Sequence, residues 1–203
     1  CSEARGLPAM TEQELLRALE LRRSSSDAPV RGLLTVTEHS LGRRNRTLHL
    51  RPDAVCFEDD GLTWLEVDRS ARGSGRASSL RALVLRIGEM THAGVPLRRV
   101  VVYTRTERIR NRVLATLRSI CVQTSGDALV EGRRQLKSLT PARFETWRTV
   151  LQPQEGGRSR LVDILCGEVM VQALPVWLPR VRMDGRGDIT TQGWLHENYL
   201  PYV

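Results

Sequence analysis

Three carboxylates of this sequence are spaced so that they could bind a metal ion together. Glu66 and Asp68 lie two positions apart in the alternating segment 62–68, and Asp53 precedes them in the chain. Alternate residues of a β-strand share a face, so Glu66 and Asp68 would lie about 6.6 Å apart along the strand. Carboxylates this close repel one another unless a cation neutralises them, and oxygen ligands favour Mg²⁺ or Mn²⁺. The alternative is that these acids only face water, as charged residues usually do.

The position of Asp53 depends on the turn that joins two expected strands, 47–57 and 62–68. An Asp-Gly pair between them is a strong hairpin signal. A two-residue turn would pair Asp53 with Asp68, and a four-residue loop would pair it with Glu66. Cross-strand partners share a face, so both registers place the three acids together, whereas a three-residue loop would turn Asp53 to the opposite face.

The same residues carry a resemblance. Pro52-Asp53, twelve further residues and then Glu66-Val67-Asp68 before a helix resemble the PD-(D/E)XK signature of restriction-endonuclease-like nucleases. The resemblance implies a central mixed β-sheet flanked by helices, a metal ion held by Asp53 and Glu66, and DNA as the partner. In our interpretation, Asp68 is a third ligand of this Mg²⁺ or Mn²⁺ or a substitute within the motif. A wider similarity over roughly residues 10–122 looks like the replication-relaxation family of plasmid and mobile-element proteins, on the segments 50–54, 64–69 and 80–83.

The sequence departs from the nuclease motif at its third position. Active members usually carry lysine there, whereas this chain has Asp68, and its only lysine is Lys137. Arg69, Arg76 or Arg81 would supply the positive charge that faces phosphate, but arginine stays protonated and cannot accept a proton. Catalysis would then depend on metal-bound water. Two hypotheses follow: a metal-dependent deoxyribonuclease with an atypical motif, or a catalytically degenerate DNA-binding protein of the same fold.

The charge of the chain agrees with DNA as the partner. Its 31 basic residues exceed its 23 acidic ones, which gives a net charge of +8, and nearly all of the basic residues are arginine. Arginine makes bidentate contacts with phosphate, although an arginine-rich composition can also reflect the base composition of a genome. The candidate DNA-binding residues lie in a basic turn, beside a glycine-rich loop and at the start of a helix: Arg43, Arg44, Arg46, Arg72, Arg76, Arg105 and Arg108.

The remaining pattern predicts an α/β core at 1–150. Thr11 opens a helix with a capping box, a strand is expected at 32–38, and the apolar run 99–103 is typical of a central strand. Helices are expected at 76–90, with Met90 on the buried face, and after a second capping box at Thr104, with Arg105, Arg108, Arg110 and Arg112 in its first turns.

Past the second of these helices the expected elements are fewer. A short strand is expected at 128–130 and a helix at 140–147 with Pro141 in its first turn. The segment 151–203 is expected to be a linker followed by an irregular extension that wraps the core or meets a protein partner. We expect one α/β domain with this extension.

Several classes of protein are disfavoured by the composition. The four cysteines show no CxxC spacing, which argues against a zinc cluster or a disulfide framework: Cys1, Cys56, Cys121 and Cys166. No apolar stretch of 18 residues and no leader peptide is evident, so we expect a cytoplasmic protein without a membrane span. A start at Cys1 instead of Met agrees with a fragment of a longer chain.

Overall fold

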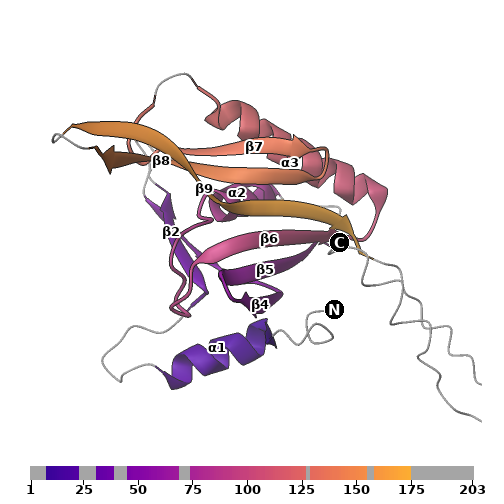
Figure 1. The fold of residues 1–203 in the computed structure, drawn as a ribbon. Helices are drawn as coiled ribbons and strands as arrows, with labels where there is room; N and C mark the ends of the chain where they lie inside the picture. The colour runs from indigo at the N-terminus through magenta and orange to yellow at the C-terminus, as the bar shows by residue number, and fades with distance from the viewer. Residues whose placement is uncertain are drawn as a thin grey trace, which may run out of the picture.

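The computed structural model describes residues 8–22, 31–38, 45–68, 74–126, 129–154 and 158–174. Within these ranges three helices accompany a seven-stranded sheet and a separate two-stranded sheet (Figure 1). The prediction of an α/β fold with a mixed central sheet is confirmed, because the seven-stranded sheet contains both parallel and antiparallel pairs.

The seven-stranded sheet has the order β1–β4–β5–β6–β9–β8–β7. Strands β5, β6 and β9 run parallel to one another at its centre, and the outer pairs on both sides are antiparallel. The bounds are β1 Ala9–Thr11, β4 Ala54–Glu58, β5 Gly61–Asp68, β6 Leu97–Thr104, β9 Ser159–Ala173, β8 Arg143–Pro153 and β7 Arg134–Thr140. The small sheet pairs β2, Leu34–Glu38, with β3, Arg46–Leu50.

The helices are α1, Glu12–Leu21, α2, Ser74–Val84, and α3, Glu107–Thr124. The predicted capping box at Thr11 is confirmed, since its side chain and that of Glu14 each bond the other residue's backbone N–H. Helix α3 begins later than predicted, because its N-cap is Thr106, whose hydroxyl accepts from the N–H of Ile109.

The hydrophobic core lies between one face of the large sheet and the helices α2 and α3. Trp64, Val100 and Val169 are aligned across β5, β6 and β9 and are buried. They belong to one cluster with Leu83 of α2 and Val113 of α3. Residues one position away on the same strands must therefore point to the other face of the sheet.

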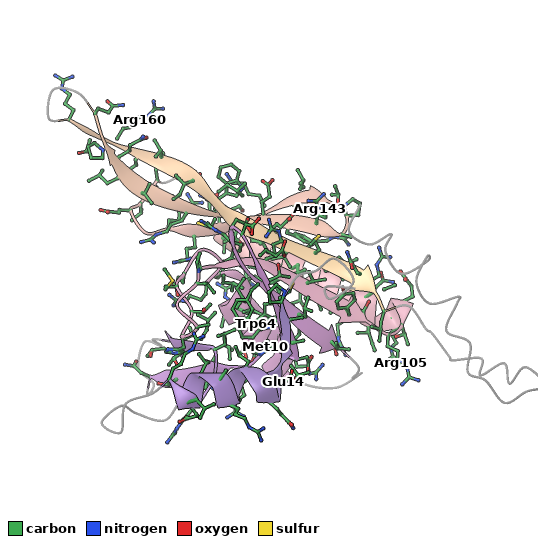
Figure 2. The ribbon with its side chains drawn as sticks, turned by 60° about the horizontal axis from the view of Figure 1, so that its bottom comes forward. Met10, Glu14, Trp64, Arg105, Arg143 and Arg160 are labelled. Carbon is green, nitrogen blue, oxygen red and sulfur yellow. The ribbon has the colours of Figure 1, made fainter. Side chains whose placement is uncertain are left out.

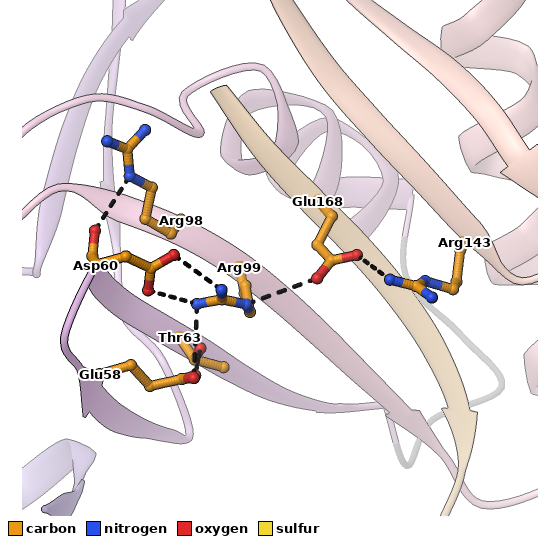
Figure 3. Close-up of polar contacts among 7 residues, drawn as sticks. All are labelled: Glu58, Asp60, Thr63, Arg98, Arg99, Arg143 and Glu168. Carbon is orange, nitrogen blue, oxygen red and sulfur yellow. Dashed lines mark hydrogen bonds and ion pairs between the residues drawn. The ribbon is translucent and has the colours of Figure 1, made fainter. Parts of the chain in front are cut away.

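That other face carries a chain of ion pairs across four segments of the sheet (Figure 3). Arg99 of β6 binds Asp60, in the β4–β5 turn, through two nitrogens at 2.8 Å each, and its Nε lies 3.6 Å from Glu168 of β9. Glu168 in turn accepts from Arg143 of β8 at 2.6 Å. One face is thus the apolar core, whereas the other carries this chain of ion pairs beside the buried Val101 of β6.

The expected strand 47–57 is wrong as a single element. The chain leaves the small sheet after Leu50 and enters the large sheet at Ala54, so residues 51–53 form a break between β3 and β4. Pro52 lies in this break, where its missing N–H costs no ladder hydrogen bond. The register after the break matches the four-residue alternative, since Ala54 pairs with Leu65.

One predicted helix is wrong, and another is shorter than predicted. Residues 143–149 belong to strand β8, where Phe144 and Thr146 are buried and their neighbours less so, which is a period of two. Pro141 lies in the β7–β8 turn and not in a helix. Helix α2 ends at Val84 instead of continuing to 90, and Met90, predicted to be buried, is 65% exposed.

The C-terminal part of the described chain is more regular than expected. Residues 159–173 were predicted to be irregular, but they form β9, which lies between β6 and β8 in the large sheet. The predicted domain boundary at 150/151 falls within β8. Figure 2 shows Arg160 near the tip of the long β8–β9 hairpin, which extends beyond the rest of the sheet.

The strand expected at 128–130 is not present in the two residues of this segment that the structure describes. Leu129 and Val130 have no strand conformation, and Ala128 lies outside the described residues.

Candidate functional site

A pocket of about 350 Å³ lies between the end of β5 and the helices α2 and α3. The side chains that line it fall into a buried group and an exposed group. Leu83, Val102 and Val113 are buried, whereas Arg76 and Arg112 are exposed, so the arginines mark the opening and the apolar side chains the inner wall. The complete lining is His49, Leu50, Arg51, Trp64, Glu66, Asp68, Arg76, Ala77, Ser79, Leu80, Leu83, Val102, Arg112, Val113 and Thr116.

Asp68 is the buried acid of this pocket, with 6% of its surface exposed. It lies at the end of β5, and two arginines from different helices bind its two oxygens. Arg76 of α2 donates to Oδ1 at 2.5 Å, and Arg112 of α3 donates to Oδ2 at 3.0 Å. A carboxylate that is removed from water needs such partners, so these contacts explain how Asp68 can be charged and buried.

Glu66 lies two residues before Asp68 on the same strand face and is half-buried. Burial raises the pKa of Glu66 above its ordinary value of 4.5, and the hydrogen bond from Trp64 Nε1 at 3.1 Å opposes this rise. The negative charges of Asp53 and Asp68 raise the pKa further, whereas Arg76 lowers it. A half-buried acid whose pKa is raised by burial and by nearby acids is a candidate for a functional role.

Asp53 approaches the same strand from the break before β4. Its Oδ2 accepts from the backbone N–H of Val67 at 2.6 Å, and its own N–H donates to the carbonyl of Leu65 at 3.1 Å. The carboxylate is therefore held beside the Glu66 region, close enough to raise the pKa of Glu66. Asp53 and Asp68 thus both lie close enough to Glu66 for their charges to act on it.

The side chains of this site are of the right type for a divalent cation, but they are not arranged around one. Carboxylate oxygens of Asp53, Glu66 and Asp68 are the donors that Mg²⁺ prefers, and a cation would relieve the repulsion that acts on Glu66. However, in the part of the chain that the structure describes, no three His, Cys, Asp or Glu side chains are arranged to hold a metal ion. Ligation would require Asp68 or Asp53 to change partners.

The predicted arginines occupy different places. Arg76 is at the pocket, as expected from its position before the helix, and Arg81 instead donates to Gln123 of α3. Arg46, Arg105 and Arg108 are exposed residues outside the pocket lining. Four further predicted residues lie outside the described residues: Arg43, Arg44, Arg69 and Arg72.

Two contributors to the site were missed from sequence. Arg112 was seen only as one of several arginines in its helix, yet it directly precedes Val113 of the buried stripe, and its guanidinium reaches Asp68 at the end of β5. Trp64 alternates with Glu66, which places its indole N–H within reach of the Glu66 carboxylate. The helix and strand periods indicate the side to which Arg112 and Trp64 point. They do not indicate which distant element each residue meets.

Comparison with known proteins finds no matching family model, no similar curated protein and no similar solved structure. The fold and the site therefore define the class that we can state, an α/β protein with a mixed seven-stranded sheet and an acidic, arginine-flanked pocket at the end of β5. The likeness to PD-(D/E)XK nucleases stays a prediction from short motifs.

Among the helices that the structure describes, none combines the length and the apolar character needed to cross a bilayer.

Proposed function

We propose that the chain is a DNA-binding protein with a nuclease-like site, which hydrolyses or nicks a phosphodiester in plasmid or mobile-element replication or transfer. The observation that supports this most is the half-buried Glu66, whose pKa is raised by burial and by Asp53 and Asp68, next to two arginines at a pocket opening. Acids that repel one another would bind a cation, and the neighbouring guanidinium groups would bind a phosphate next to it.

In this proposal the acids bind the cation and the arginines bind the phosphate. Asp53 and Glu66 would hold the cation, with Asp68 as a third ligand or a substitute for the usual lysine. A bound Mg²⁺ or Mn²⁺ would supply an activated water and neutralise charge on the phosphate. Arg76 and Arg112 would orient the phosphate, since the guanidinium group makes bidentate contacts with oxyanions.

The test is nicking of supercoiled plasmid in the presence of Mn²⁺. The wild-type protein should convert it to the open circular form, and Glu66→Gln and Asp53→Asn should each reduce the rate by at least about a hundredfold. Glu145→Gln is a matched control, because Glu145 of β8 accepts from Trp147 Nε1 at 3.0 Å, as Glu66 does from Trp64, but lies outside the pocket. Equal nicking by wild type and Glu66→Gln would refute a catalytic role for Glu66.

A second candidate is a DNA-binding protein that has lost turnover. One specific observation favours it: Asp68 stands where the resembled nucleases carry lysine, and its ion pairs occupy Arg76 and Arg112 at the opening. This candidate predicts that DNA binding survives Asp53→Asn and Glu66→Gln without nicking in either Mg²⁺ or Mn²⁺.

Salt dependence separates both candidates from a protein-interaction adaptor. Binding through phosphate contacts weakens steeply as salt rises, because counterions are released when the arginines bind. An adaptor would bind DNA weakly or not at all. A flat affinity between about 50 and 200 mM salt would therefore exclude DNA as the natural partner.

A further inference from the structure

The pocket at Glu66 is larger and more apolar than a phosphate needs. Phosphate recognition requires only the charged groups at the opening, yet behind them lies an inner wall of carbon. The apolar side chains of this wall come from β3, β5, α2, β6 and α3: Leu50, Trp64, Leu80, Leu83, Val102 and Val113. A cavity of about 350 Å³ falls within the size range of small-molecule sites, about 300–1,000 Å³.

The polar groups along this wall bond within the protein. Ser79 Oγ donates to the carbonyl of Gly75 at 3.1 Å, and Thr116 Oγ1 donates to that of Arg112 at 3.0 Å. The indole N–H of Trp64 is bonded to Glu66, and its ring is buried, with 1% exposed. An occupant would therefore gain mainly apolar contact from the wall, with Glu66 as the polar group at its edge.

The opening has the opposite character. Arg51, Arg76 and Arg112 are exposed there, and each reaches the pocket from a different element. A ligand that satisfies both parts has a flat, weakly polar body and an anionic end. A nucleotide has this form when its base is withdrawn from the stack, since every base has an apolar face and remains linked to phosphate.

We propose that the pocket takes up one unstacked base of a single-stranded or locally opened DNA, while Arg76 and Arg112 hold the adjoining phosphate. This inference rests on the proposed function, because it specifies the form of DNA that the same site would bind. The hydroxyl protons of Ser79 and Thr116 on this wall are donated to backbone carbonyls, so recognition of the base depends on apolar contact more than on hydrogen bonds from these groups. Single-stranded DNA is then the preferred ligand over duplex.

The experiment compares a short single-stranded oligonucleotide with the duplex of the same sequence, and places one 2-aminopurine in the single strand. The wild-type protein should bind the single strand about tenfold more tightly, as expected for insertion of one base. The 2-aminopurine emission should change on binding, because the base leaves its stacked neighbours. Equal affinity for the two forms, with no change in emission, would overturn the inference.

Ala77→Trp tests the pocket itself. Ala77 is an exposed residue of α2 at the opening, so a bulky side chain there should block entry and leave the core intact. We expect the single-strand preference to disappear while the protein still binds duplex DNA. Ala115→Trp is the matched control, since Ala115 is exposed on α3 outside the pocket lining and should retain the preference.

Thr116→Phe fills the pocket from the other helix and should have the same effect as Ala77→Trp, with folding checked by circular dichroism. Retention of the preference in both pocket variants would overturn the inference. Duplex nicking or duplex binding that persists in that case would leave the proposed function standing. Failure of the wild-type protein to bind either form of DNA would instead refute the proposed function, and this inference with it.

Discussion

Arg112 of α3 donates to the carboxylate of Asp68 at 3.0 Å, although 44 positions separate the two residues in the chain. The contact joins the end of β5 to α3, and Arg76 makes a parallel contact from α2. One buried acid thus fixes the relative positions of the strand and both helices around the pocket.

Asp68→Asn should destabilise the protein. The substitution leaves the Asp68 position hydrogen-bonded but uncharged, and the two arginines lose their counter-charge. We expect the free energy of unfolding to fall by about 1–3 kcal/mol, measured by urea denaturation. Asp59→Asn is the control, because Asp59 is exposed in the β4–β5 turn and its change should stay within about 0.5 kcal/mol. Equal stability of Asp68→Asn and wild type would show that the ion pairs contribute nothing net.

Glu66→Gln should change the pH dependence of stability. Because the pKa of Glu66 is raised in the folded protein, ionisation of this group costs folding free energy as pH rises from 4.5 through the folded value. Glutamine does not titrate, so the variant should be more stable than wild type at about pH 7.5. The difference should shrink below about pH 4, where the carboxyl is protonated in both states. Thermal unfolding across this range measures it, and a variant less stable at neutral pH would contradict the sign.

Mn²⁺ should raise the melting temperature of the wild-type protein more than that of Glu66→Gln. A ligand that binds only the folded state stabilises it by mass action, and Glu66 is one of the proposed ligands. Glu145→Gln should respond to Mn²⁺ as the wild type does, because its carboxylate is outside the pocket. An equal shift in all three proteins would assign the effect to metal bound elsewhere.

Arg99→Met should weaken the polar face of the sheet. Arg99 joins Asp60 of the β4–β5 turn to Glu168 of β9, and its loss leaves these acids without their shared cation. We expect a loss of about 1 kcal/mol that decreases in 1 M salt, since such partly exposed pairs are screened. Arg118→Met is the control, because Arg118 is an exposed residue of α3.

The same variant should shift the titration of Asp60. Hydrogen bonds from Arg99 hold the pKa of Asp60 below its ordinary 3.8, so the pair stabilises the folded state above that value and the contribution is lost as pH falls through the folded pKa. Without Arg99 the pKa of Asp60 should rise, which NMR titration of the side chain would detect.

Gly167→Ala should disrupt the pairing of β9 with β6. A Cβ at this position would lie 1.9 Å from the carbonyl oxygen of Arg98, which is rigid backbone of the neighbouring strand. We expect a loss of about 3 kcal/mol, at the upper end for overpacked sites. Gly75→Ala is the control, because nothing lies within 4 Å of its added Cβ. Normal stability of Gly167→Ala would place β9 elsewhere in the sheet.

Local patterns determined much of the fold and part of the site. The alternation in 62–68 placed Glu66 and Asp68 on one face of β5, and the capping box at Thr11 marked the start of α1, because strand period and cap chemistry act over a few residues. The position of Arg76 at the start of a helix just after this strand also followed from order along the chain.

Only the tertiary structure decided which distant elements meet. The insertion of β9 between β6 and β8 depends on pairing between β6 and β9 residues about 70 positions apart, and no local pattern encodes such a partner. The contact of Arg112 with Asp68 has the same origin, since α3 must first pack on the sheet before the guanidinium reaches the buried carboxylate. The spacing in the sequence therefore determined which acids lie together. Long-range packing determined which arginines pair with Asp68 and which side chains form the apolar pocket.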